Sequence, residues 1–263
     1  MMKIEEILNS KKGKLILSGI SILILFYVIV ISVAPIRKLN ELKRQVYADT
    51  VFYAQNSALL HYQQLFELNK TKALKEAELI IAQKDTFALV VNLNDSTVSL
   101  MLKGVKIHSA KIYQYKKDRF FNGINPLVYA KLFSKPMRTQ SEFSSIVKEP
   151  IIIKKAPKDT IEAITNAYMP DTLIQNPAYL NLEIEHGFKL YLIQNEFNTP
   201  EEKAIERQMQ QDIRKRKIAD VFGNFIHWKH GSYTPNLVLY IRADELRSAY
   251  RAIPADVLVV LTY

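Results

Sequence analysis

The stretch TFALVVNLNDSTVSLMLKGVKIHSAKIY, residues 86–113, decides the fold that this sequence predicts. It contains three strand-like runs, which are residues 87–93, 97–102 and 105–113. Asn94-Asp95-Ser96 and Lys103-Gly104 lie between these runs, and both clusters consist of residue types that favour tight turns. Three short strands joined by tight turns predict an antiparallel meander.

The C-terminal part of the chain also contains short strand-like runs. Strand-like runs occur at residues 151–154, 179–184, 188–193, 238–241 and 257–262, and helices are expected at 159–167, 199–222 and 243–252. Thr199, Pro200 and Glu202 form a capping box at a helix start, and Gly223 is the expected C-cap of that helix. The last run, VLVVLT, is almost wholly apolar, which predicts a strand inside the sheet. Residues 86–263 are therefore expected to form one mostly β (α+β) domain.

The N-terminal part of the chain reads differently. Residues 15–34, LILSGISILILFYVIVISVA, contain no charge and no proline, and a helix of about 20 residues spans a bilayer core of roughly 30 Å. This run predicts one transmembrane helix. A cleaved signal peptide is the alternative, but Pro35 directly follows the candidate cleavage site and argues for an uncleaved anchor.

Residues 36–84 contain no glycine and repeat apolar residues near helical spacing, which predicts a helical stalk. The expected organisation is thus a cytoplasmic tail (1–14), a transmembrane helix (15–34), the stalk (36–84) and the folded domain (86–263). Four basic residues flank the apolar run on each side, so charge gives no orientation. The short N-terminal tail favours a single-pass protein of the inner or plasma membrane with an extracytoplasmic (periplasmic) domain.

Composition limits the chemistry and the partners. The chain has no cysteine, which excludes a thiol nucleophile and cysteine metal ligands. Its net charge of +10 favours contact with anionic lipids or acidic cell-wall polymers, whereas no nucleic-acid recognition motif is present. Polar Asn56 and Gln63 within the stalk would suit pairing with partner helices. We expect the membrane and other proteins as partners, and no nucleic acid.

The last sixty residues carry a resemblance to a known family. His230-Gly231 is followed by LVLYIR (237–242), the helix ADELRSAYRAI and the strand ADVLVVL. This order resembles the end of an L,D-transpeptidase catalytic domain, the fold that cross-links bacterial peptidoglycan. In that family a His-Gly pair precedes a Ser-x-Gly-Cys-x-Arg motif, a short helix and a terminal strand. Residues 87–107 also resemble the first hairpins of that family. The resemblance implies a β-sandwich fold.

The resemblance also implies that the enzyme is inactive. Tyr240 stands where the family has its catalytic cysteine, and only Arg242 matches the motif outright. A phenol is almost wholly protonated at neutral pH, so it replaces a thiolate poorly. We therefore expect no catalytic residue and no cofactor. The expected binding residues are His230, Gly231, Tyr240 and Arg242.

Three further motifs carry weaker hypotheses. His227 and His230 have the spacing of a metal-ligand pair, but no third ligand is near them, so no metal is expected. Ser145-x-x-Lys148 has the spacing found in penicillin-recognising enzymes, without their companion motifs. The basic run Arg214, Lys215, Arg216 and Lys217 either forms a solvated helix face or contacts lipid or an acidic partner.

Taken together, these patterns predict a non-catalytic, membrane-anchored envelope protein that binds or scaffolds at the cell wall. The alternative is a structural subunit of a multi-protein machine that spans the envelope. An active hydrolase or transferase is the third class, and the absence of cysteine argues against a transpeptidase.

Overall fold

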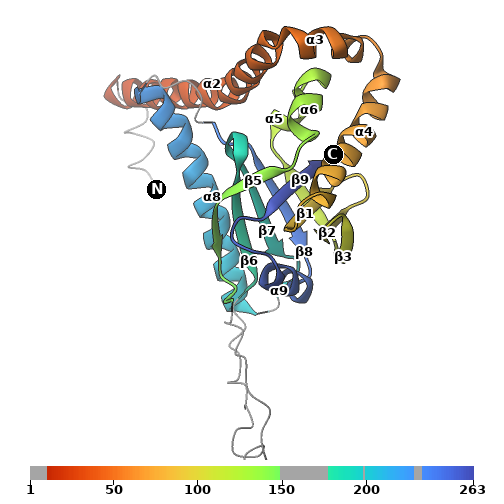
Figure 1. The fold of residues 1–263 in the computed structure, drawn as a ribbon. Coiled ribbons are helices and arrows are strands. Elements are labelled where there is room, and N and C mark those ends of the chain that lie inside the picture. Colours follow the sequence, from red (N-terminus) through yellow and green to blue (C-terminus); the bar gives the residue numbers. More distant parts are fainter. Residues whose placement is uncertain (1–10, 149–176, 198, 228–232) are drawn as a thin grey trace, which may run out of the picture. The chain divides into compact units, whose positions relative to one another are not determined.

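The computed structural model describes residues 11–148, 177–197, 199–227 and 233–263 (Figure 1). The chain divides into two compact units, and each is described by itself. The sheet unit consists of Lys72–Lys116, Phe133–Gln210 and Asn236–Tyr263. The helical unit consists of Met1–Thr71, Lys117–Leu132 and Gln211–Pro235.

The sheet unit is built on a nine-stranded sheet with the order β3-β2-β1-β9-β5-β6-β7-β8-β4. Its strands are β1 Phe87–Asn92, β2 Thr97–Leu102, β3 Val105–Lys111, β4 Gln114–Lys117, β5 Met137–Ser144, β6 Tyr179–Ile184, β7 Phe188–Gln194, β8 Asn236–Ile241 and β9 Leu258–Thr262. The pairs β1–β9 and β7–β8 are parallel, and the pairs β1–β2, β2–β3, β5–β6, β5–β9 and β6–β7 are antiparallel.

Two predictions about the strands are confirmed. The meander exists as expected, because Phe87 pairs with Leu102 and Thr97 pairs with Lys111. The apolar terminal strand β9 lies between β1 and β5, inside the sheet. The predicted strands 179–184 and 188–193 are also present as β6 and β7, and the turn between them has His186 and Gly187 at φ 63° and 75°.

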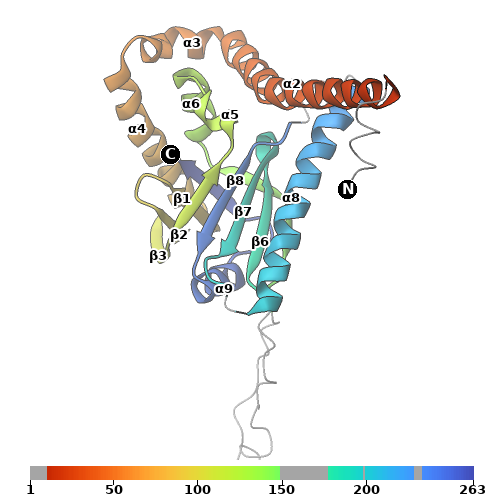
Figure 2. The ribbon, with the colours of Figure 1, turned by 180° about the vertical axis from the view of Figure 1, so that it is seen from behind.

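Strand β5 joins two halves of the sheet. Its first residues, Met137 and Arg138, pair with β9, whereas Thr139–Ser144 pair with β6. We call β3-β2-β1-β9 the β1 half and β6-β7-β8-β4 the β7 half. Strands β6, β7 and β8 of the β7 half can be followed from behind in Figure 2.

The two ends of the strand order are neighbours in the chain. Only Ile112 and Tyr113 separate β3 from β4. The Ile112 N–H donates to the carbonyl of Ser96 at 2.8 Å, and the Tyr113 N–H donates to the carbonyl of Tyr240 at 2.9 Å. Strands β3 and β4 are therefore two parts of one extended segment. Its first part pairs with β2 through one edge of the segment, and its second part pairs with β8 through the opposite edge.

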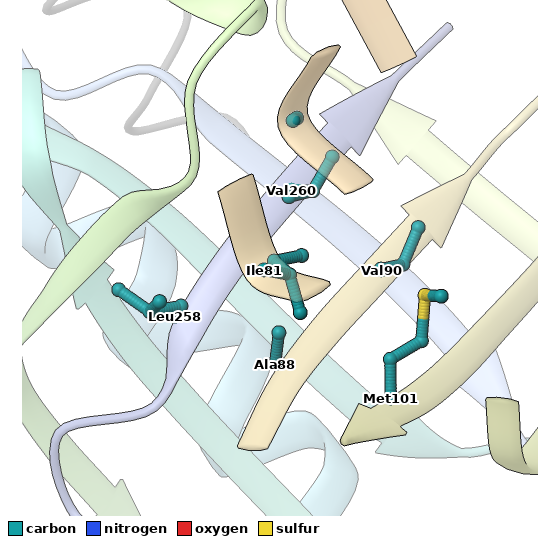
Figure 3. Close-up of a cluster of buried hydrophobic side chains, with 7 residues drawn as sticks. Ile81, Ala88, Val90, Met101, Leu258 and Val260 are labelled. Carbon is teal, nitrogen blue, oxygen red and sulfur yellow. The ribbon is translucent and has the colours of Figure 1, made fainter. Parts of the chain in front are cut away.

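A helix covers each half of the sheet. The C-terminal turns of α4 (Gln63–Ala82) place Ala77 and Ile81 against β1, β2 and β9, where they are fully buried (Figure 3). The partners in this cluster are Ala88, Val90, Met101, Leu258 and Val260. Helix α9 (Ala243–Ala252) contacts β7 and buries Leu246 and Tyr250. Its bounds agree with the predicted helix 243–252.

The helical unit contains α2 (Lys11–Ala48), α3 (Thr50–Asn56), η1 (Ser57–Leu60), α5 (Arg119–Asn122), α6 (Pro126–Phe133), the start of α4 and most of α8 (Pro200–His227). The expected helix 36–84 is interrupted, because Asp49 caps α3 by accepting the Phe52 N–H at 3.0 Å. Asp49 also pairs with Lys131 of α6 at 2.6 Å. The hydrogen bonds from Lys131 and Phe52 lower the pKa of Asp49.

The predicted transmembrane anchor is contradicted. Among the described residues, no helix combines the length and the apolar character that crossing a membrane requires. The run 15–34 is not a separate element, because α2 continues through Pro35 to Ala48. This second part of α2 carries a Lys38–Glu41 ion pair and buries Leu42. The apolar run forms only the first part of α2, where Leu15 is 76% exposed.

The predicted fold class is also corrected. The protein is a mixed α/β structure with a nine-stranded sheet, not a mostly β domain behind an anchor. Two elements that were not predicted also belong to it, since Pro126 begins α6 and Pro136 directly precedes β5. Helix α8 continues through its expected C-cap to His227. The predicted strand 151–154 and helix 159–167 lie outside the described residues.

Candidate binding pocket

A pocket of about 390 Å³ lies beside the C-terminal end of β8 in the sheet unit. Four segments that are distant in sequence line it: β4, β8, the chain after β7, and the first turns of α8. The lining residues are Gln114, Lys116, Asn195, Phe197, Lys203, Glu206, Arg207 and Tyr240. All of them belong to the sheet unit.

Tyr240 is the most buried aromatic group of this lining, with 7% of the residue exposed. Its carbonyl accepts the Tyr113 N–H, which fixes β8 against β4. Its hydroxyl accepts a hydrogen bond from Lys116 Nζ at 3.3 Å, and the same Nζ lies 5.3 Å from the centre of the Tyr240 ring. The phenol and the ammonium group therefore form one polar centre in the pocket.

Strand β7 ends in a buried glutamine, Gln194, which positions the part of the pocket lining that follows β7. Gln194 is 1% exposed; its Oε1 accepts the Ala178 N–H at 2.7 Å and its Nε2 donates to the carbonyl of Glu196 at 2.7 Å. The Asn195 N–H donates to the carbonyl of Ile241 at 2.7 Å. The buried amide of Gln194 thus has hydrogen-bond partners within the protein. Its bonds, together with the backbone bond of Asn195, hold Asn195 at the pocket.

The first turns of α8 supply the remaining wall. Thr199 Oγ1 accepts the Glu202 N–H, and Glu202 Oε2 accepts the Thr199 N–H, both at 3.1 Å, so the predicted capping box is confirmed. Lys203 and Arg207 lie four residues apart, which places them on one side of the helix. Among the described residues, neither has a carboxylate within ion-pair distance.

The lining is basic. Lys116, Lys203 and Arg207 carry positive charge, against the single carboxylate of Glu206. Glu206 Oε1 already accepts a hydrogen bond from Gln210 Nε2 at 2.8 Å. The amides of Gln114 and Asn195 add neutral donors. An arrangement with three cations and several hydrogen-bond donors favours an anionic ligand, and carboxylates and phosphates have the matching chemistry.

Arg242 was expected beside Tyr240, but it does not line the pocket. Its guanidinium binds the carboxylate of Asp244 through two contacts, Nε–Oδ1 at 3.1 Å and Nη2–Oδ2 at 2.6 Å. The charge and the hydrogen bond of Asp244 raise the pKa of Arg242. The pKa of Asp244 is lowered: desolvation acts against this direction, but the backbone N–H of Glu245 and the Arg242 charge outweigh it.

Of the other predicted contact residues, Arg214 and Lys215 are not among those that line the pocket. His230 and Gly231 lie outside the described residues, and so does the pair that His230 was considered to form with His227. Arg214 and Lys215 are exposed on α8, and Arg216 and Lys217 lie on the same helix. All four belong to the helical unit, whereas Tyr240 belongs to the sheet unit.

Sequence reasoning singled out only Tyr240 among the eight lining residues. The i, i+4 spacing of Lys203 and Arg207 behind a strong capping box was a signal that one face of α8 is basic. No local pattern could have connected that face with Gln114 and Lys116, because the contact depends on which strand neighbours β8.

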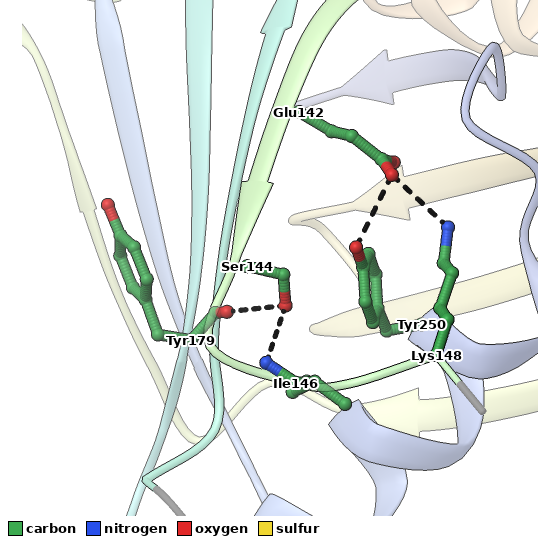
Figure 4. A network of polar contacts seen from close by, with 6 residues as sticks. All are labelled: Glu142, Ser144, Ile146, Lys148, Tyr179 and Tyr250. Atoms are coloured by element: carbon green, nitrogen blue, oxygen red, sulfur yellow. Dashed lines mark hydrogen bonds and ion pairs between the residues drawn. The ribbon is translucent and has the colours of Figure 1, made fainter.

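A second polar cluster surrounds Glu142 of β5 in the sheet unit (Figure 4). Glu142 Oε1 accepts hydrogen bonds from Lys148 Nζ and from the Tyr250 hydroxyl, both at 3.3 Å. Lys148 Nζ also lies 4.3 Å from the centre of the Tyr250 ring. The Ser145 hydroxyl donates to the carbonyl of Pro177 at 2.6 Å, so Ser145 and Lys148 have separate partners. This cluster ties β5 to α9.

The described residues contain no group of three or more histidine, aspartate or glutamate side chains that could hold a metal ion. Searches for similar proteins found no matching family model, no matching curated protein and no matching solved structure.

Proposed function

We propose that this protein is a non-catalytic binding protein whose pocket beside Tyr240 holds the carboxylate of a small ligand. The observation that carries the proposal is the set of three cations, Lys116, Lys203 and Arg207, around a buried phenol. Lys203 and Arg207 are not neutralised by an ion pair among the described residues, so their charge is available to a ligand.

The resemblance to L,D-transpeptidases supplies the ligand class. It implies peptidoglycan fragments, whose stem peptides end in a free carboxylate, and it makes Tyr240 the counterpart of the catalytic cysteine. Because the chain has no cysteine, a thiolate mechanism is excluded. We therefore infer recognition of wall peptides without cross-linking or trimming, which places the binding domain at the cell wall.

Calorimetry with the full chain and N-acetyl-D-alanine tests the proposal. We expect saturable binding that weakens with added salt, and at least about tenfold weaker binding of N-acetyl-D-alanine amide, because a charge-assisted hydrogen bond contributes about 1.5–3 kcal/mol. The double variant Lys203→Gln/Arg207→Gln should lose at least as much affinity for the acid.

The matched control is Lys72→Gln/Lys84→Gln, which removes two charges from the same unit at exposed positions outside the lining. Equal affinity of the acid and the amide, or equal effects of the two double variants, would contradict a carboxylate pocket and would favour a structural subunit. Mass spectrometry of muropeptides incubated with the protein checks the second claim. New cross-links or released D-alanine, lost in Tyr240→Phe, would show an enzyme.

A further inference from the structure

The strand that forms one wall of the pocket is also the last strand of the sheet. In the strand order of the described residues, β4 has β8 on one side and no strand on the other. All four residues of β4, Gln114–Lys117, are exposed. An edge strand of this kind presents backbone N–H and C=O groups to which another extended chain can pair.

The direction of these backbone groups follows from one hydrogen bond. The Tyr113 N–H donates to the carbonyl of Tyr240, so the backbone groups of residue 113 face β8. Backbone groups of successive residues in a strand point to opposite edges. The backbone groups of Gln114 and Lys116 therefore face the open edge, while their side chains line the pocket.

The charge of the segment suits an anionic chain. Residues 105–116 contain three lysines, Lys106, Lys111 and Lys116, and no aspartate or glutamate. An incoming peptide would thus meet an open backbone edge and a basic pocket on the same strand. Addition of a strand combined with capture of a terminal carboxylate is an established way for proteins to bind peptides.

We propose that the ligand of the pocket is an extended peptide that adds to the open edge of β4 and places its C-terminal carboxylate among Lys116, Lys203 and Arg207. This inference rests on the proposed carboxylate pocket and goes beyond it, because it assigns a backbone-mediated subsite to Gln114 and Lys116. The side chains of the peptide would then contribute less to affinity than its extended backbone and its terminus.

Two ligands with the same terminus separate the pocket from the edge. The first is N-acetyl-D-alanine, and the second is acetyl-tetra-alanine with D-alanine as its last residue. NMR titration of the full chain should give at least about fivefold tighter binding of the longer ligand, because each backbone hydrogen bond contributes about 0.5–1.5 kcal/mol. N-methylation of an amide of the longer ligand that faces β4 should weaken binding, whereas N-methylation of the adjacent amide, which faces away from β4, should not.

The protein offers a matched pair of variants. Gln114→Pro removes the outward N–H of β4, and Gln114→Ala removes the same side chain but keeps that N–H. Proline is tolerated on an edge strand where its nitrogen faces solvent, so β4 should still form. We expect Gln114→Pro to bind the longer ligand about threefold to tenfold more weakly than Gln114→Ala, with equal affinities of the two variants for N-acetyl-D-alanine.

The outcomes are distinct. If N-acetyl-D-alanine binds, but the longer ligand gains nothing and both methylated peptides bind equally, the edge inference is overturned and the carboxylate pocket stands. If neither ligand binds, the proposed function fails as well. Circular dichroism and the melting temperature of each variant confirm folding; should Gln114→Pro unfold, the N-methylated pair alone decides the inference.

Discussion

The two halves of the sheet differ in what their strands line. In the β1 half, residues 88–91, 98–101 and 258–262 are buried without interruption, and Ala77 and Ile81 of α4 cover one face. Both halves bury polar residues, which are Ser99 and Thr262 in the β1 half and Asn181, Gln194 and Asn236 in the β7 half. In the β7 half, Tyr240 also opens onto the pocket. The β1 half thus packs its strands under a covering helix, whereas the β7 half also lines the binding pocket.

Two polar residues of the β7 half, Asn181 and Asn236, share a face with Tyr240, whereas Gln194 lies on the other face. Side chains alternate along a strand, so Asn236, Val238 and Tyr240 lie on one face of β8. The Oδ1 atoms of Asn181 and Asn236 are buried with no hydrogen-bond partner among the described residues. Unsatisfied buried polar atoms reduce stability. His108 Nε2 of β3, in the β1 half, is also buried without a partner among the described residues, so this feature occurs in both halves. The pocket lies in the β7 half, and we infer that recognition resides there.

The largest expected effect is on stability and comes from removing side-chain atoms from the apolar core of the β1 half. Ile81→Ala should lower the free energy of unfolding by about 2–5 kcal/mol, because Ile81 is 0% exposed within the cluster. Leu79→Ala on the same helix is the control: Leu79 is 61% exposed, and its loss should change stability by less than about 0.5 kcal/mol. Urea denaturation of both variants measures the difference. Equal effects would mean that α4 does not pack on the sheet.

The turns of the two halves allow a direct comparison. Gly104 of the β2–β3 turn has φ 77°, and an added Cβ would lie 2.7 Å from Ala82 Cβ. Gly187 of the β6–β7 turn has φ 75° and nothing within 4 Å. Gly187→Ala should cost about 1–2 kcal/mol for the backbone conformation alone, and Gly104→Ala should cost about 1–3 kcal/mol more for the clash. Thermal denaturation decides this, and the reverse order would refute the packing of α4.

Removal of one hydroxyl tests the pocket of the β7 half. Tyr240→Phe deletes the acceptor of the Lys116 hydrogen bond and should weaken binding of N-acetyl-D-alanine about threefold to tenfold, with little change in melting temperature. Tyr115→Phe is the control, since Tyr115 is 41% exposed and does not line the pocket. If both variants bind as the wild type does, Tyr240 has no part in recognition.

The smallest expected effect depends on pH. Burial, and then the charge of Glu142, raise the pKa of Tyr250 above its ordinary value. Because the folded protein favours the neutral phenol, this contribution to stability is present below pH about 10 and is lost as the pH rises through the raised pKa. The melting temperature should therefore fall more steeply above pH 10 in the wild type than in Tyr250→Phe. Parallel curves would show that Tyr250 does not link folding to pH.

Local sequence patterns predicted most strands of both halves, including β6, β7 and β8, whereas β4 and the connecting strand β5 were not predicted. The alternation and turns of residues 86–113 lie within one stretch, and the apolar character of 257–262 indicated a strand with neighbours on both sides. Strand β5 was missed because MRTQSEFS is polar on most positions; its pairing with β6 and β9 provides the strand that its composition did not suggest.

The remaining errors also have physical causes. The apolar window 15–34 was treated as a complete element, although α2 continues into a charged and partly buried segment. The pocket could not be predicted, because its residues meet only after β4 has paired with β8. Arg242 matched the family motif, yet Asp244, two residues later, binds its guanidinium. A motif specifies residue types, whereas the neighbours decide which groups remain available.

The position of β9 has a consequence for synthesis of the protein. During translation, the β1–β2–β3 meander emerges early, whereas its parallel neighbour is made only when Leu258–Thr262 is translated. Until then, the apolar edge of β1 has no partner strand, and β5 cannot join the two halves. Such long-range pairing folds slowly and leaves strand edges open to other nascent chains. The edge of β1 is therefore open to pairing with other chains until residues 258–262 have been made.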